Sequence, residues 1–399
     1  MLSVKANLLA SRGHEVSIVV LRLKGRKPFF PIDPSVNIVD LSAPYLSLPG
    51  HPSSANATSD SPRTTVSSAV GSTSNPSTMA SERLKGSVRE RLSRVVEMLD
   101  PDVCVSLCGP EVRILPAVAG GRPCVAEYHF SHDKFYRKYG GIFMYPYAWL
   151  RTHMLERAVS EYDCMVTLTE HDLPIWKRHC RRVERIFNPV TTPPGQVSRL
   201  AEKRMIAVGR LEDQKNFKDL VSAWSIVAER CPDWRLEIFG EGKLEHALRS
   251  QIARLGLTGS VILRGVVKDI ASEYSNSSAL LMTSLHEGFP LALVEASSFG
   301  LPLISYDCPT GPSEIIVDAG DGGGVGNVPE ATLDQAAGNT PNGYLVPVGD
   351  VRTLADRICR IASDDNLRLR LGAASKASSR RFTPETIISA WEHLFSSLL

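Results

Sequence analysis

Two glutamates eight residues apart, Glu287 and Glu295, have the spacing in this sequence that most clearly suggests a ligand site. Between them, Pro290 suits the first position of a helix, because its missing N–H would be unpaired there anyway. We therefore expect a strand that ends near residue 284, a tight Glu-Gly turn, and a helix that begins at 290. The free N–H groups at the start of that helix can bind a phosphate.

The separation of the two carboxylates limits the chemistry that they can do. At a rise of about 1.5 Å per residue, they lie on the order of 10 Å apart along the helix axis. This is too far for the two carboxylates of a retaining glycosidase, which stand about 5 Å apart. The spacing suits the two ends of one elongated ligand, such as the hexose and the ribose of a nucleotide-sugar. The alternative is that both glutamates are solvent-exposed charges.

Two cations follow the apolar run from Met205 to Val208, which predicts a buried strand ending in Gly209. Arg210 and Lys215 would then lie at the carboxyl edge of a parallel sheet, where open α/β sheets bind their ligands. A guanidinium fork and an ammonium point charge could together neutralise a diphosphate. The alternative is two surface cations beside a loop.

A histidine, His129, follows a predicted short strand at 123–126. An imidazole at a strand end can hydrogen-bond a sugar hydroxyl or a carbonyl. A structural histidine is the alternative, and His132 is a second candidate for the same role.

The elements that must position these residues alternate between strand and helix. Apolar strands alternating with helices predict parallel sheets that are covered on both faces. Strands are predicted at 16–20, 101–105, 123–126, 204–209, 235–239, 260–263, 279–282 and 302–305, with another before residue 169. Helices are predicted at 2–12, 83–99, from 158, and at 216–230, 243–255, 270–274, 290–299 and 384–398.

The pattern forms two blocks, which predicts two Rossmann-like domains, 1–190 and 191–383. Two irregular stretches interrupt it. Residues 50–80 are rich in Ser and Thr and poor in large apolar residues, so we expect a disordered insert. Residues 318–341 are rich in Gly, Ala and Asn, and we expect an inserted loop. The Gly320–Gly326 run does not fit a dinucleotide-binding loop.

The composition excludes several classes of protein. With 45 Lys and Arg against 43 Asp and Glu, the net charge of +2 argues against a dedicated nucleic-acid binder. No run reaches the ~18 apolar residues of a spanning helix, and no signal-peptide core is evident. The eight scattered cysteines indicate reduced thiols and not a zinc site or a disulfide framework. We therefore predict a cytoplasmic protein.

Basic residues suggest a membrane surface as a possible partner. Positive charges occur on the helix at 83–94 and again at Lys134, Arg137 and Lys138. Such groups attract anionic lipids, which would allow peripheral binding at the inner face of a membrane. A solvated helix face is the alternative.

Taken together, these segments resemble the retaining glycosyltransferases of family 4, which have the GT-B fold. The E-x7-E signature is present as Glu287 and Glu295, and residues 208–211 with Lys215 are similar to the donor-diphosphate motif. Residues 128–130 resemble the His segment of capsule and exopolysaccharide members. Further matching segments are 167–172, 187–189, 238–242 and 307–314. The resemblance covers 1–50, 85–317 and 342–399.

The resemblance implies roles for individual residues. Arg210 and Lys215, with Gly209, would hold the donor diphosphate, and Glu295 the ribose hydroxyls. Glu287 and the backbone of Gly288, Phe289, Pro290 and Leu291 would contact the hexose and the distal phosphate. His129 would reach the sugar from the first domain, and the base would stack near Val266.

The resemblance also implies the reaction. A hexose would pass from a nucleotide-sugar to a glycan or lipid-linked acceptor with retention of configuration, in cell-surface polysaccharide or glycoconjugate synthesis. The 307–314 segment resembles members that use UDP-hexoses, so a UDP-sugar is favoured. We expect neither a cofactor nor a metal, because no Asp-x-Asp stands at a strand end. The two sheets would face each other across a cleft, and the helix 384–399 would pack back on the first domain.

One departure from the family lies at the start of the chain. Members begin with a strand and a Gly-rich loop before the helix found here at 2–12. We therefore expect the first strand of the N-terminal domain to be missing. This leaves a catalytically impaired nucleotide-binding remnant as an alternative to an active enzyme. A GT-B epimerase or a phosphorylase-like enzyme fits less well.

Overall fold

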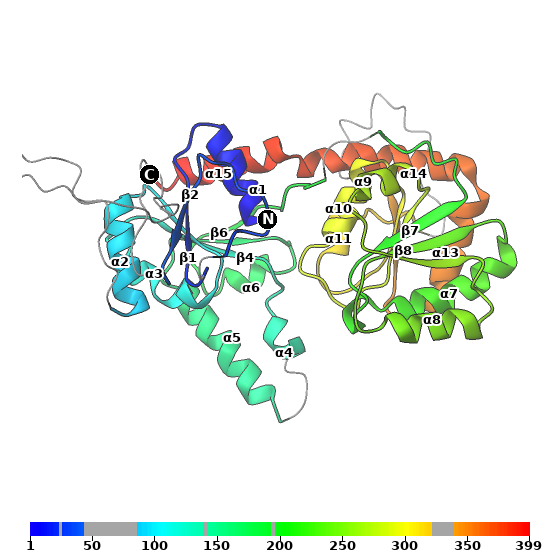
Figure 1. Cartoon of the computed structure of the whole chain (residues 1–399), viewed down its shortest axis with the longest axis horizontal. Helices are drawn as coiled ribbons and strands as arrows, with labels where there is room; N and C mark the ends of the chain where they lie inside the picture. Colours follow the sequence, from blue (N-terminus) through cyan, green and yellow to red (C-terminus); the bar gives the residue numbers. More distant parts are fainter. Residues whose placement is uncertain (24–25, 44–85, 139–142, 193–195, 321–338) are drawn as a thin grey trace, which may run out of the picture. The chain divides into compact units, whose positions relative to one another are not determined.

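The computed structural model describes residues 1–23, 26–43, 86–138, 143–192, 196–320 and 339–399 (Figure 1). The chain forms two compact units. The first comprises Met1–Cys104 with Ile114–Arg122, and the second comprises Val105–Arg113 with Pro123–Leu399. Most of the predicted inserts at 50–80 and 318–341 lies outside the described residues.

The first unit is built around a short parallel strand pair. Helix α1 (Leu2–Ser11) precedes β1 (Ser17–Val20), which pairs in parallel with β2 (Asn37–Asp40). Ala6, Ile18 and Val36 form its small buried core. Helices α2 (Val88–Leu99) and α3 (Leu115–Val118) complete the unit. At the start of α2, Ser87 and Glu90 form a capping box, which satisfies free N–H groups of the first turn.

The second unit contains a four-stranded sheet in the order β3-β4-β5-β6. Its strands are β3 (Cys104–Ser106, whose first residue belongs to the first unit), β4 (Cys124–Tyr128), β5 (Cys164–Thr167) and β6 (Val183–Arg185). Pairing is parallel between β4 and β5 and between β5 and β6. The helices of this part are α4 (Lys134–Lys138), α5 (Tyr145–Val159) and α6 (Leu173–Trp176), with a 3₁₀ turn at Pro110–Arg113.

A six-stranded parallel sheet follows, in the order β12-β11-β10-β7-β8-β9. Its strands are β7 (Arg204–Val208), β8 (Arg235–Phe239), β9 (Val261–Gly265), β10 (Leu280–Met282), β11 (Leu303–Tyr306) and β12 (Gly343–Val346). The strand order reverses between β7 and β10, and this switch point is where open α/β sheets bind ligands.

Helices connect the strands of this sheet and follow its last strand, β12. They are α7 (Phe217–Arg230), α8 (Glu245–Arg254), α9 (Ile270–Ser275), α10 (Leu291–Ser298), α11 (Pro312–Ile315), α13 (Val351–Ser363), α14 (Asp365–Ser378) and α15 (Pro384–Ser396). Short 3₁₀ turns lie at Asp213–Lys215 and Ser379–Phe382.

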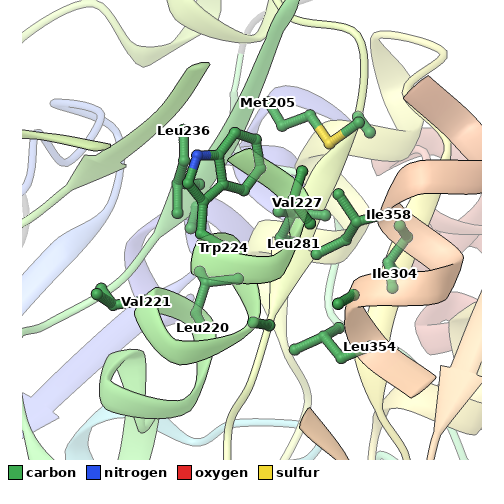
Figure 2. Close-up of a cluster of buried hydrophobic side chains, with 14 of the residues drawn as sticks. Met205, Leu220, Val221, Trp224, Val227, Leu236, Leu281, Ile304, Leu354 and Ile358 are labelled. Atoms are coloured by element: carbon green, nitrogen blue, oxygen red, sulfur yellow. The ribbon is translucent and has the colours of Figure 1, made fainter. Parts of the chain in front are cut away.

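Two apolar clusters hold this sheet. In one, the fully buried indole of Trp224 on α7 packs among side chains of the sheet and of α13, including Leu236, Leu281 and Ile358 (Figure 2). The other cluster gathers α10 with Phe289 and Phe299. The strands carry nearly continuous apolar runs, as expected for a parallel sheet that is covered on both faces.

The α/β prediction with parallel sheets is confirmed. The helix predicted at 2–12 is α1, and Gly13 just beyond it has a φ of +93°. The five strands predicted from 204 to 305 are present, with the four helices between them. The helix predicted from 83 begins at Val88, with Ser87 as its cap, and residues 83–85 lie outside the described part. The bounds of the helix predicted from 158 are wrong, because α5 runs from Tyr145 to Val159 and ends where that helix was expected to begin.

The described part of the chain also contains elements that the sequence prediction did not include: β2, β6, β12, α3, α4, α6, α11, α13 and α14. The chain leaves β6 at Arg185 and enters β7 at Arg204, a span that includes residue 190. The domain bounds of 1–190 and 191–383 stay a prediction. So does the packing of 384–399 on the first domain, although α15 does bury an apolar face that contains Ile388 and Trp391.

Candidate functional site

Glu287 lies in the loop that joins β10 to α10, at the switch point of the six-stranded sheet. Its side chain is largely buried. The loop ends as expected in a helix N-terminus, but Pro290 is the N-cap and Leu291 is the first helical residue. The backbone of Pro290 is extended, which explains why the helix starts one residue later than predicted.

The loop after β7 meets this loop directly. The Lys215 ammonium lies 2.6 Å from Oε1 of Glu287. The Gln214 amide donates to the backbone carbonyl of His286 at 2.8 Å. Thr283 Oγ1 donates to the carbonyl of Lys215 at 3.0 Å. The structure thus brings together two motifs that are 72 residues apart in the chain.

Glycines allow the neighbouring loops to approach so closely. A Cβ on Gly240, whose φ is +137°, would stand 2.0 Å from the carbonyl oxygen of Gly209. A Cβ on Gly242 would stand 2.5 Å from the carbonyl oxygen of Leu211. A Cβ on Gly209 itself would crowd the aliphatic stem of Lys215 at 3.0 Å. The glycines after β8 therefore fix the backbone that carries Arg210 and Lys215.

The 307–314 segment packs against the same glutamate. Thr310 donates its hydroxyl to the backbone carbonyl of Glu287. A Cβ on Gly311, whose φ is +100°, would stand 2.5 Å from Cδ of Pro290. This segment therefore supports the Glu287 loop from the side of β11.

Glu295 has partners of its own on α10. Its two carboxylate oxygens accept from Thr191 Oγ1 at 2.9 Å and from Tyr274 OH at 3.1 Å. Burial, and then the Glu295 charge, raise the pKa of Tyr274 well above its usual value. The phenol therefore remains a hydrogen-bond donor to the carboxylate at physiological pH.

His129 follows β4 directly, as predicted. Its Nε2 lies 3.2 Å from Oε1 of Glu127, a carboxylate that is almost fully buried. Its Nδ1 lies 3.5 Å from the Asn188 side-chain amide. A Cβ on Gly288 would stand 2.6 Å from the backbone oxygen of His129. The His129 and Glu287 segments are therefore neighbours, and only glycine fits at 288 without a shift.

The remaining predicted residues occupy different environments. Arg210 is exposed, and its side chain has no hydrogen bond or ion pair with any residue that the structure describes. Val266 is also exposed, at 68%. Phe289 is buried in the core and its ring stacks on Phe187, so its side chain has a packing role. Leu291 is half-buried against the same core.

His132 does not join this group, because its imidazole lies against Glu156 on α5. His286 is the neighbour of Glu287, and burial followed by the Arg137 charge lowers its pKa. It is therefore largely neutral at physiological pH.

Several residues that complete the site were not predicted as such. These residues are Glu127, Thr191, Gln214 and Tyr274. Thr191, Gln214 and Tyr274 reach their partners across 21 to 104 residues, whereas Glu127 meets His129 two residues along the chain. Glu127 could have been found, since it lies two residues before His129 in a strand and so faces the same side of the sheet. No sequence signal marks Tyr274 or Thr191.

A pocket of about 730 Å³ lies beside the residues of the candidate site, and those residues do not line it. It is lined by Leu285, Asp307, Asp318 and the end of β12. Burial, and then the Asp318 charge, raise the pKa of Asp307. The pocket shares the β10–α10 loop with the site, but none of the predicted donor-binding residues lines it.

Residues 193–378 match the family described as glycosyl transferases group 1. An uncharacterized glycosyltransferase of Haemophilus influenzae is 24% identical over 97% of this chain and 92% of its own length. The amylovoran biosynthesis glycosyltransferase AmsD of Erwinia amylovora is 30% identical over 49% of this chain and 48% of its own length. The chain thus spans nearly all of one relative and about half of the other.

Solved structures of low identity share the fold. Sucrose-phosphate synthase from Thermosynechococcus elongatus has a TM-score of 0.64 at 16% identity and covers 99% of this chain and 91% of its own. Anabaena HepE in complex with UDP has a TM-score of 0.61 at 18% identity and covers 77% of this chain and 82% of its own. The chain has the GT-B fold of these structures, and residues 193–378 are similar to the glycosyl transferases of group 1.

Proposed function

We propose that the chain transfers a hexose from a UDP-sugar to a glycan or lipid-linked acceptor, with retention of anomeric configuration, in the synthesis of a cell-surface polysaccharide or glycoconjugate. The observation that carries this proposal is the 2.6 Å contact between Lys215 and Glu287. It joins a cation and a carboxylate from two different loops at the switch point of the sheet.

The charges fit the bond that must break. Cleavage of the anomeric C–O bond places positive charge on the sugar and negative charge on the leaving diphosphate. Three positive groups lie at this carboxyl edge of the sheet: the ammonium of Lys215, the unengaged guanidinium of Arg210 and the N-terminus of α10. Groups fixed where charge develops lower the barrier electrostatically.

Donor binding would break this ion pair between Lys215 and Glu287. A bound diphosphate competes with Glu287 for the Lys215 ammonium and releases the carboxylate. Glu287 is then available to accept hydrogen bonds from hydroxyls of the hexose. Because two side-chain cations already neutralise the diphosphate, we expect transfer to need no metal at this site.

His129 is proposed to contact the transferred sugar. Glu127 and Asn188 hold its two ring nitrogens, so the imidazole is oriented before a ligand arrives. In a front-face substitution, the leaving phosphate would take the proton of the acceptor hydroxyl. The sugar would therefore keep its configuration without a covalent intermediate.

Support for UDP comes from two sources. The 307–314 segment resembles UDP-hexose users, and its residues Thr310 and Gly311 contact the Glu287 loop. Anabaena HepE, which shares the fold, is described in complex with UDP. Glu295 would bind the ribose hydroxyls and the base would stack near Val266.

The acceptor is proposed to be presented at the cytoplasmic face of a membrane. In the described residues, no helix is long and apolar enough to cross a bilayer. The start of α5 nonetheless exposes large apolar side chains: Met144, Tyr145, Tyr147, Trp149 and Leu150. Exposed Trp and Tyr next to the cations of α4 are typical of a membrane–water interface.

The impaired remnant is not favoured as an alternative. The three charged groups that a donor would meet, Lys215, Glu287 and Glu295, all have partners that orient them. The match to a glycosyltransferase group 1 domain includes all three.

The proposal is tested by incubating the full chain with single UDP-hexoses and a mixed pool of glycan acceptors. We expect UDP release that persists in excess EDTA, and a product with the anomeric configuration of the donor by NMR. Complete loss of activity in EDTA that Mn²⁺ restores would contradict metal-independent transfer. A product of inverted configuration would contradict retention.

A further inference from the structure

One carboxylate of the four-stranded part is faced by three imidazoles. Glu156 on α5 places Oε1 2.8 Å from Nε2 of His132 and 3.4 Å from Nε2 of His179. Its other oxygen, Oε2, lies 3.4 Å from Nδ1 of His153. None of these four residues belongs to the proposed donor site, so the cluster needs a separate explanation.

From this geometry we propose that His132, Glu156 and His179 bind a divalent transition-metal ion of the Zn²⁺ class. Their ligand atoms all lie within 4.8 Å of one another. A tetrahedral zinc ion with bonds of about 2.0–2.2 Å separates its ligands by roughly 3.4 Å. The 3.4 Å spacing between His179 and Glu156 equals that value, and the 2.8 Å spacing between His132 and Glu156 is about 0.6 Å shorter.

The donor set suits such an ion. Two imidazoles with one carboxylate form a known set for zinc that leaves a fourth position open to water. Without an ion, His132 Nε2 lies at hydrogen-bond distance from Oε1 of Glu156, 2.8 Å, and His179 Nε2 lies 3.4 Å from the same oxygen. A metal ion instead gives these three atoms a common partner, with both imidazoles neutral.

The surroundings hold the rings in place. The three ligands come from the loop after β4, from α5 and from the turn after α6. The His132 ring packs edge-on against the fully buried Trp176 at 5.2 Å and stacks with the His179 ring at 6.4 Å. The ligand side chains are 15–28% exposed, so solvent and an ion can reach them.

A bound ion would link these three elements through one common partner. His132 lies three residues after His129 on the same loop. The ion would therefore stiffen the loop that carries His129, which is a structural role. The inference does not depend on the identity of the sugar donor.

The test uses the full chain without affinity-tag histidines. Its thiols are blocked so that Cys231 and Cys359, which lie next to each other, cannot bind metal together. After EDTA treatment and dialysis, equilibrium dialysis against Zn²⁺ should give one ion per chain. Substitution with Co²⁺ should give visible d–d absorption without a thiolate band. Affinity should fall on acidification, because an imidazole must be neutral to bind a metal ion.

Two variants and one control decide the outcome. Glu156→Gln keeps the volume of the side chain, and His179→Asn changes the most exposed ligand; each should weaken Zn²⁺ binding at least tenfold. His246→Asn, on the exposed surface of α8, should leave binding unchanged. Zn²⁺ should raise the melting temperature of the wild type and of the control only. Equal affinity in all four proteins, or no binding by a wild type that melts cooperatively, would overturn the proposal.

Discussion

Among single residues, Lys215 is the one on which the proposed donor site depends most. Its ammonium pairs with the buried Glu287 and is proposed to meet the donor diphosphate. Replacing it with Met keeps the stem that lies over Gly209 but removes the charge.

Lys215→Met should therefore lower kcat by roughly 10²–10³, the cost of losing one group that stabilises developing negative charge. Steady-state kinetics with a UDP-hexose measure this loss. Lys218→Met, an exposed lysine on α7, is the matched control and should keep wild-type activity. If both variants have similar kinetics, Lys215 does not take part in the mechanism.

Gly288 is the second residue on which the site depends. A methyl group there would meet the His129 carbonyl oxygen at 2.6 Å, so one of the two loops must move. Gly288→Ala should cut activity at least tenfold, because displacement of catalytic groups by about 1 Å is costly. Gly259→Ala, where a Cβ meets nothing within 4 Å, should be neutral. Unchanged activity in Gly288→Ala would show that the contact is not needed.

At the scale of elements, the β8–α8 loop supports the donor loop through close backbone contact. Gly240 has a φ of +137°, and a Cβ added there would stand 2.0 Å from the carbonyl oxygen of Gly209. Gly256 has a φ of +69° but open space around it.

Gly240→Ala should therefore lower the free energy of unfolding by more than the about 1–2 kcal/mol that backbone strain alone costs. Gly256→Ala should lower the free energy of unfolding only by the cost of backbone strain. Urea denaturation of both variants separates the two contributions. Equal losses would mean that the loops do not depend on this contact.

The elements also show what the sequence could and could not predict. The five strands from 204 to 305 were predictable because each is an apolar run between turn residues. β6 is only Val-Glu-Arg, and its pairing with β5 decides its conformation. By contrast, α13 carries Leu354, Ile358 and Ile361 at helical spacing, so it could have been predicted.

The candidate site also contains features that the sequence could predict and features that it could not. Glu287, Lys215 and His129 could be identified from their positions after predicted strands. Which residues pair across the site could not be identified, because Lys215 meets Glu287 across 72 residues and Glu295 meets Thr191 across 104. Such pairs depend on how the strands are ordered in the sheet, which spacing along the chain does not reveal.

At the scale of the whole molecule, the proposed acceptor implies contact with a membrane. The full chain should float with vesicles that contain anionic lipid, and not with neutral ones, because its cations and exposed aromatics act together. Trp149→Ser, at an exposed position on α5, should reduce flotation. The exposed Leu369→Ser on α14 is the control. Flotation that does not depend on anionic lipid would contradict this part of the proposal.

The proposed function requires an assembled site for a UDP-linked donor. A thermal-shift titration of the full chain with UDP and with GDP tests it most directly. A ligand at about 100 times its Kd adds about 2.7 kcal/mol to the stability of the folded state, which such a titration detects. Glu295→Ala removes the proposed ribose contact, and the exposed Glu229→Ala on α7 is its control.

We predict a rise in melting temperature with UDP that exceeds the rise with GDP. The rise should be lost in Glu295→Ala and kept in Glu229→Ala. A flat response to both nucleotides, in a chain that melts cooperatively, would contradict the claim.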